Sequence, residues 1–170
     1  MTRQRPDTVG WRTALCILAL VGLGSAAQAD EASQRAFIVK WAGSYNSEGF
    51  LNEPAVRGEL QKLLGDEMAH LLRNLNVRGA VDVSGETLSV NGNAPHQGTE
   101  EEAVVCATVL PLKTIVEAAI LSKGAVTVYM REEPYENASI CIKDWITLAN
   151  SGHIDRMKQP PNVRVLTPLR

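Results

Sequence analysis

Apolar residues in the first part of the chain recur at the spacing of α-helices. Residues 31–41 show this spacing and predict a short first helix. A second helix is expected after Asn52, a candidate cap, with Pro54 in its first turn and one apolar face of Val56, Leu60, Leu63 and Leu64. Gly65 ends that run. Asp66 is then expected to cap a further turn or two with an apolar face of Met68, Leu71, Leu72 and Leu75.

Between residues 80 and 130 the apolar pattern changes to a period of two. Residues 80–84 and 87–90 alternate around a Gly85-Glu86 turn, which predicts a β-hairpin. Further strands are expected at residues 103–110, 114–121 and 125–130. The connections between them are short, whereas parallel neighbours need a crossover of about a dozen residues. The pattern therefore predicts a five-stranded antiparallel meander.

A closing helix is predicted after the strands. Asn137 is the expected cap, Gly152 the expected end, and the apolar stripe is Ile140, Cys141, Trp145, Ile146 and Leu148. From Gln159 onward the chain is expected to be extended and weakly held. The predicted fold class is α+β, with about five antiparallel strands, N-terminal helices and a C-terminal helix packed on the sheet.

The first 29 residues have the features of an export signal. Arg3, Arg5 and Arg12 precede an apolar core at residues 14–23, and the small residues Ala27 and Ala29 mark a cleavage site. The core is shorter than the roughly 20 residues of a transmembrane helix, so no membrane span is expected after cleavage. The predicted organisation is a cleaved signal peptide at 1–29, a single α+β domain at 30–158 and an extended tail at 159–170.

Charge and cysteine content narrow the compartment and the partners. The chain has 17 basic and 19 acidic residues, of which 14 and 18 lie in residues 30–170, a net charge of −4. This balance argues against nucleic acid and favours a basic protein partner, while homodimerisation stays open. Cys106 and Cys141 remain after cleavage, and an oxidising compartment favours a disulfide between them. The alternative is two separate buried thiols.

Metal binding and catalysis find little support in the sequence. His70, His96 and His153 lie far apart, so no metal or cofactor is predicted, and His70 is expected to pair with Asp66 on a helix surface. A small envelope enzyme would have to use Cys141 or His96, but the apolar neighbours of Cys141 indicate packing. No Gly-x-Ser-x-Gly motif is present. We therefore predict a protein that is not an enzyme.

The loop at residues 91–98 is the best functional lead. Gly92 and Gly98 can adopt backbone angles closed to other residues, and Pro95 fixes its own φ. Binding groups concentrate on loops held by a rigid scaffold, so His96 is the first candidate. The acidic run after the loop would attract a basic surface, although it can equally be a solvated strand edge. The predicted partner-binding residues are Asn93, Pro95, His96, Gln97, Gly98, Glu100 and Glu101.

Residues 89–98, chiefly Pro95, His96 and Gly98, with Ala103 in the next strand, resemble the Ivy family of periplasmic inhibitors of vertebrate (c-type) lysozyme. Those inhibitors fold as an antiparallel sheet with packed helices and present a Pro-His loop to the lysozyme cleft. The resemblance implies that His96 acts as a plug. In that family two cysteines enclose the Pro-His pair, whereas this chain has Asn93 and Gln97 or Gly98 at those places.

The predicted function is therefore periplasmic inhibition of a cell-wall hydrolase, first of all c-type lysozyme. Two alternatives stay open at this point. One is an immunity protein that neutralises a secreted peptidoglycan amidase or muramidase toxin. The other is a non-catalytic binding protein of the cell envelope.

Overall fold

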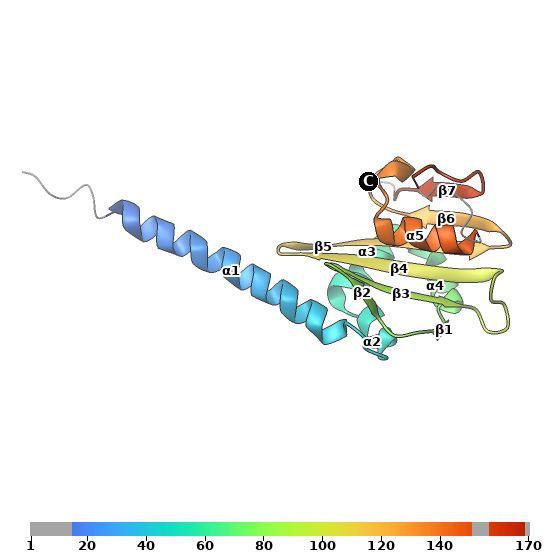
Figure 1. The fold of residues 1–170 in the computed structure, drawn as a ribbon, viewed down its shortest axis with the longest axis horizontal. Coiled ribbons are helices and arrows are strands. Elements are labelled where there is room, and N and C mark those ends of the chain that lie inside the picture. The colour runs from blue at the N-terminus through green and yellow to red at the C-terminus, as the bar shows by residue number, and fades with distance from the viewer. Residues whose placement is uncertain (1–14, 151–156, 169–170) are drawn as a thin grey trace, which may run out of the picture.

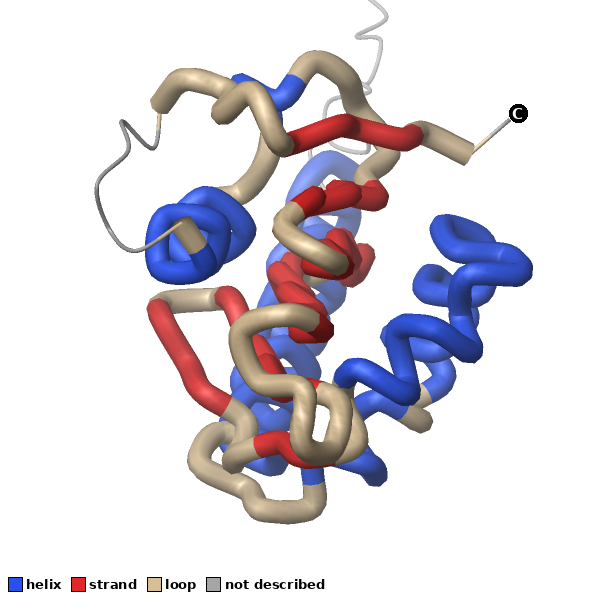
Figure 2. The backbone as a smooth tube through the Cα atoms, turned by 90° about the vertical axis from the view of Figure 1, so that its right-hand side faces the viewer, coloured by secondary structure: helices blue, strands red, loops and turns tan. Residues whose placement is uncertain are grey.

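A computed structural model of the chain describes residues 15–150 and 157–168. Its centre is a seven-stranded sheet, and helices lie on both faces of that sheet (Figure 1, Figure 2). The predicted α+β class is confirmed, with two strands more than expected.

The strands follow the order β1-β3-β4-β5-β6-β7, and β2 also pairs with β3. Every pair is antiparallel except β6 and β7. The five predicted strands correspond to β2 to β6, with ends shifted by a few residues. The full set is β1 (Val77–Arg78), β2 (Asp82–Ser84), β3 (Thr87–Asn93), β4 (Glu101–Leu110), β5 (Lys113–Ser122), β6 (Ala125–Tyr129) and β7 (Val163–Leu166).

The prediction that the chain is weakly held from Gln159 onward is wrong, because part of this tail forms β7. Val163–Leu166 pairs parallel with β6, from Val126 opposite Val163 to Tyr129 opposite Leu166. The chain between β6 and β7 is a long crossover that contains a helix, as parallel pairing requires. The four residues of β7 are the shortest run in which a period of two can be read, and Leu166 breaks the alternation of Val163, Arg164 and Val165.

On one face of the sheet lie α1 (Leu15–Trp41), α2 (Ser47–Leu51), α3 (Pro54–Leu64) and α4 (Met68–Asn74). The apolar faces predicted for α3 and α4 are confirmed, except that Leu72 is only partly buried. The predicted caps are wrong. Asn52 ends α2 and Glu53 precedes Pro54, while Asp66 lies in a 3₁₀ turn without capping α4.

The first helix is longer than predicted. It starts at Leu15, inside the segment expected to be the signal peptide, and only its last turns reach the sheet (Figure 1). There Phe37 and Ile38 pack against the core, and the side chain of Gln34 donates a hydrogen bond of 2.6 Å to the carbonyl of Val109. In residues 15–150 and 157–168, no helix has the length and hydropathy to cross a membrane.

The opposite face of the sheet is covered by α5 (Ile140–Ala149). The predicted disulfide is confirmed and joins Cys106 of β4 to Cys141 of α5. The cap prediction is wrong, because the hydroxyl of Ser139 accepts from the Ile142 amide at 3.3 Å, whereas Asn137 lies in the preceding 3₁₀ turn. The predicted apolar stripe is partly wrong, since Ile142 is buried but Ile140 and Leu148 are exposed. Gly152 lies outside the described residues.

Candidate functional site

The loop that contains Pro95 and His96 joins β3 to β4 at one end of the sheet (Figure 1). The last paired residues before it are Asn93 and Glu102, and the Ala94 amide donates to the carbonyl of Glu101 at 2.9 Å. The two strands thus stay hydrogen-bonded up to the first residue of the loop, which fixes where the loop leaves the sheet.

A tight turn forms the tip of the loop. The Gln97 amide donates to the carbonyl of Ala94 at 3.1 Å, which places Pro95 and His96 at the two central positions. His96 has a φ of +62°, as the third position of a type II turn requires. Glycine or asparagine is usual there, because a left-handed φ costs other residues roughly 1–2 kcal/mol. The turn therefore holds His96 in a backbone conformation that is unfavourable for histidine.

The expected role of the two glycines is wrong. Positive φ values in this loop belong to His96 and Thr99, not to Gly92 or Gly98. Gly92 is required for another reason: a Cβ at this position would lie 2.5 Å from the backbone oxygen of Val77 in β1. Glycine therefore permits the close approach of two strands beside the loop.

Hydrogen bonds tie down the second half of the loop. The amides of Glu100 and Glu101 both donate to the carbonyl of Gln97, at 3.2 and 2.9 Å. The Thr99 amide donates to the carboxylate of Glu102 at 2.8 Å. The Asn93 side chain donates to the carbonyl of Ala94, also at 2.8 Å. These contacts restrain the backbone of the loop between Asn93 and Glu102.

The side chains at the tip face solvent. Pro95, His96, Gln97, Gly98 and Glu100 are exposed. The imidazole of His96 has no hydrogen-bond partner in the described part of the chain. The structure therefore presents a rigidly connected backbone with a free histidine side chain at its end.

Glu101 differs from the other predicted site residues, because its side chain turns inward and is only 8% exposed. One carboxylate oxygen accepts from Ser122 at 2.6 Å, and the other lies 3.1 Å from both His70 and Asn74. Burial opposes ionisation, but hydrogen bonds from Ser122, His70 and Asn74 outweigh it and hold the pKa of Glu101 at about 2. Glu101 thus anchors the base of the loop and does not extend its exposed acidic surface.

The predicted pairing of His70 with Asp66 is wrong, because Glu101 points inward and contacts His70. One ring nitrogen of His70 lies 3.1 Å from Glu67, and the other lies 3.1 Å from Glu101. Asp66, the predicted partner, does not take part. In the described residues no group of three histidines, cysteines or acids is arranged to hold a metal ion.

Comparison with known families matches residues 55–148 to the model of the inhibitor of vertebrate lysozyme (Ivy). The match covers more than half of the chain. This protein belongs to the Ivy family. The matched segment contains the loop, its two flanking strands and both cysteines of the disulfide. Neither the curated proteins nor the solved structures contain a significant match.

The family is described as inhibitors of vertebrate lysozyme. Six of the seven predicted partner-binding residues lie together on the β3–β4 loop or at its edge, and Glu101 lies beneath it. The sequence reasoning missed Thr99 and Glu102 as a structural pair. Their Thr-x-x-Glu spacing is that of a capping box, so a local signal was available. The partners of Glu101 are 21 to 31 residues distant, and no local signal indicates them.

Proposed function

We propose that this member of the Ivy family inhibits c-type lysozyme by inserting the Pro95–His96 turn into the active-site cleft. The observation that carries the proposal is the state of His96. Its side chain is exposed and unpartnered among the described residues, and its backbone has an unfavourable positive φ. Strained backbone that is held by its surroundings is typical of functional positions.

The chemistry of a retaining glycosidase suits a histidine plug. Such an enzyme has two carboxyl groups about 5–5.5 Å apart in its cleft. A protonated imidazole has two N–H donors on opposite sides of its ring and can donate to both carboxyl groups at once. His96 would then occupy the space of the scissile sugar bond and exclude substrate.

The hydrogen-bonded turns support tight binding in place of the missing cysteines. A loop that already has its bound shape loses less conformational freedom on association. Six backbone or side-chain bonds restrain residues 93–101, those donated by Asn93, Ala94, Gln97, Thr99, Glu100 and Glu101. The loop therefore acts as a preformed insert.

Electrostatics support a basic partner. Residues 30–170 carry a net charge of −4, and Glu100 is an exposed acid next to the tip. Complementary charge speeds the encounter of two proteins more than it raises their final affinity. We expect the association rate with a basic lysozyme to fall as salt concentration rises.

Export is part of the proposal. Residues 1–29 would be removed as the signal peptide, and the mature chain would act in the periplasm. The disulfide between Cys106 and Cys141 supports this location, because such bonds persist in oxidising compartments.

The test is an inhibition assay with purified residues 30–170. Lysis of bacterial cell walls by c-type lysozyme is followed by turbidity, with increasing amounts of inhibitor. His96→Ala and His96→Gly should each weaken inhibition by at least about a hundredfold, because two hydrogen bonds to charged groups are lost. His96→Gly matters most, since glycine relieves the backbone strain and removes only the imidazole.

The control is Lys113→Ala, a change at the other end of β4 and β5 that should leave inhibition unchanged. Absence of inhibition by the wild-type protein would exclude the proposed function. Full inhibition by His96→Gly would exclude the histidine plug while keeping the family function. A bacterial muramidase assayed in parallel tests the immunity-protein alternative.

A further inference from the structure

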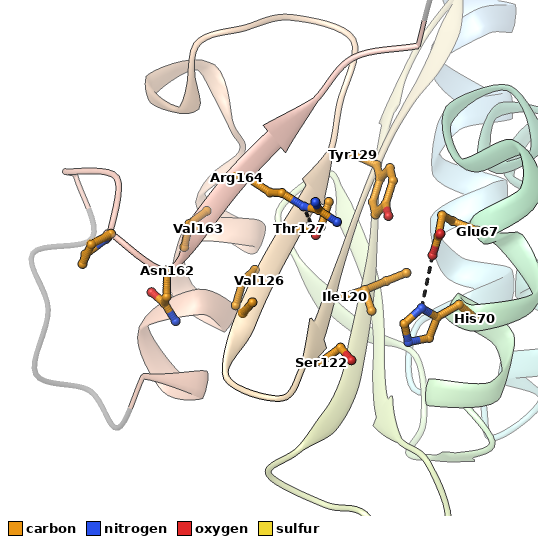
Figure 3. Close-up of a pocket in the computed structure, with 12 residues that line it drawn as sticks. Glu67, His70, Ile120, Ser122, Val126, Thr127, Tyr129, Asn162, Val163 and Arg164 are labelled. Atoms are coloured by element: carbon orange, nitrogen blue, oxygen red, sulfur yellow. Dashed lines mark hydrogen bonds and ion pairs between the residues drawn. The ribbon is translucent and has the colours of Figure 1, made fainter.

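A pocket of about 580 Å³ lies between α4 and the strands β5, β6 and β7 (Figure 3). None of its lining residues comes from the loop that contains His96. Its volume is in the range of sites that take small molecules. The pocket therefore excludes the exposed loop, although His70 and Ser122 in its lining also bond to Glu101 at the base of the loop.

The hydroxyl of Tyr129 is the first sign of a ligand. Tyr129 lines the pocket from β6 and is only 5% exposed. No described residue forms a hydrogen bond with its hydroxyl. A buried phenol normally finds a hydrogen-bond partner. The hydroxyl is not one of the fully enclosed polar atoms of the described chain, so it opens onto the pocket, where water or a ligand can bond to it.

Charged groups with unused bonding capacity lie on both sides of this phenol. Arg164 donates through Nε to the hydroxyl of Thr127 at 2.7 Å, and its two terminal nitrogens have no partner in the described chain. Glu67 is bound through one carboxylate oxygen to His70 at 3.1 Å, and its other oxygen has no hydrogen bond. Figure 3 shows Tyr129 between Arg164 and Glu67.

The electrostatics of Tyr129 agree with this arrangement. Its pKa is raised by burial and by the negative charge of Glu67, while the positive charge of Arg164 lowers it. Both charges therefore act on the phenol across the pocket. A ligand beside Tyr129 would meet a positive group on one side and a negative group on the other.

We propose that this pocket binds a small zwitterion, either a free amino acid or a short peptide with free termini. The carboxylate pairs with the terminal nitrogens of Arg164, the ammonium group pairs with Glu67, and the Tyr129 hydroxyl bonds to the ligand between them. Ile120 and Val163 supply apolar walls for the part of the ligand without charge.

The pairing of opposite charges determines this ligand class. A simple anion would bind Arg164 but approach Glu67, and a simple cation would bind Glu67 but approach Arg164. Both side chains are exposed and hydrated in the free protein, and a molecule with both charges gains an ion pair from each of them. The two charged residues, Glu67 just before α4 and Arg164 in β7, lie outside the β3–β4 loop, so the binding test does not depend on lysozyme inhibition.

The test is calorimetric titration of residues 30–170 with glycine, diglycine and triglycine. These three probes have the same two charges at increasing separation. At least one should bind saturably, and its N-acetyl and C-amide analogues should bind at least about tenfold more weakly, because each lacks one charge. The absence of saturable binding by all three probes would overturn the proposal, and so would equal binding of the blocked analogues.

Matched variants locate the site. Arg164→Gln and Glu67→Gln should each weaken binding by at least about tenfold, and Arg164→Lys should restore part of the loss in the first. Tyr129→Phe should weaken it by a smaller factor. Arg57→Gln, a change on α3 outside the pocket, should have no effect. Unchanged affinity in folded Arg164→Gln, with folding checked by circular dichroism, would contradict the proposed site.

Discussion

The two helical layers of this protein are attached to the same sheet by different means. On one face α5 is fixed covalently, through the disulfide of Cys106 and Cys141. On the other face α3 and α4 are held by apolar packing and by the hydrogen bonds of Glu101 to His70 and Asn74. The β3–β4 loop ends at Glu101, so its geometry depends on the non-covalent layer.

Two buried glutamates, Glu101 and Glu117, also differ, because their pKa values are shifted in opposite directions. Glu101 and Glu117 are 8% and 7% exposed. The pKa of Glu101 is about 2, because three side chains donate to it and outweigh the effect of burial. The pKa of Glu117 is raised, because burial outweighs the hydrogen bonds from Ser139. At Glu101 the surrounding donors and the charge of His70 outweigh burial, whereas at Glu117 burial outweighs the Ser139 bonds and the charge of Lys143.

The largest expected effect comes from removal of the disulfide. The double change Cys106→Ala and Cys141→Ala should lower the free energy of unfolding by about 3–4 kcal/mol, since the bond closes a loop of 35 residues. Urea denaturation measures the loss. Inhibition of lysozyme by the fraction that stays folded should be unchanged. A loss of inhibition beyond the unfolded fraction would show that the loop depends on the α5 layer.

Glu101→Gln should be the next most harmful change. The substitution leaves buried donors on Ser122, His70 and Asn74 without a charged acceptor, at a cost of about 2–3 kcal/mol. Inhibition should also weaken, because the base of the loop loses its anchor. Glu100→Gln is the matched control and should change stability by less than about 0.5 kcal/mol. Equal behaviour of the two variants in urea would refute the anchoring role.

The pH dependence of stability sharpens the role of Glu101. Because its folded pKa of about 2 lies below the ordinary value of 4.5, its contribution is complete above pH 4.5 and disappears as the pH falls toward 2. Urea midpoints of the wild type should drop over this interval. Those of Glu101→Gln should drop less, and parallel curves for the two proteins would contradict the assignment.

The smallest expected effect is that of Glu117→Gln. Since the folded pKa of Glu117 is raised, the ionised carboxylate weakens the fold once the pH exceeds that value. The neutral amide should therefore stabilise the protein at pH 7 by up to about 1 kcal/mol while still accepting from Ser139. Thermal melts at pH 7 and pH 4 measure this, and the gain should vanish at pH 4. Marked destabilisation at pH 7 would disprove it.

Local patterns were sufficient for most of the fold. The period of two residues predicted the strands β2 to β6, and helical spacing predicted the buried faces of α3 and α4. The disulfide followed from an exported chain with two remaining cysteines. These features depend on residues close in sequence, or on a choice with few alternatives.

Contacts distant in sequence could not be predicted in the same way. Glu101 was placed on the surface with its neighbours, although its partners come from α4 and from the end of β5. The parallel pairing of β7 with β6 likewise joins a strand that precedes α5 in the sequence to one that follows it. The positive φ of His96 depends on the hydrogen bond that closes its turn, which no pattern of residue types specifies.

The central claim is that hydrogen-bonded turns give the loop a fixed shape without a disulfide. Hydrogen exchange of the Gln97 amide, measured by NMR in the free protein, tests it most directly. This amide closes the turn that presents His96. We predict that it exchanges far more slowly than the exposed amide of Gly98, and that Glu101→Gln reduces this protection. Exchange of Gln97 at the rate of an unstructured peptide would contradict the claim.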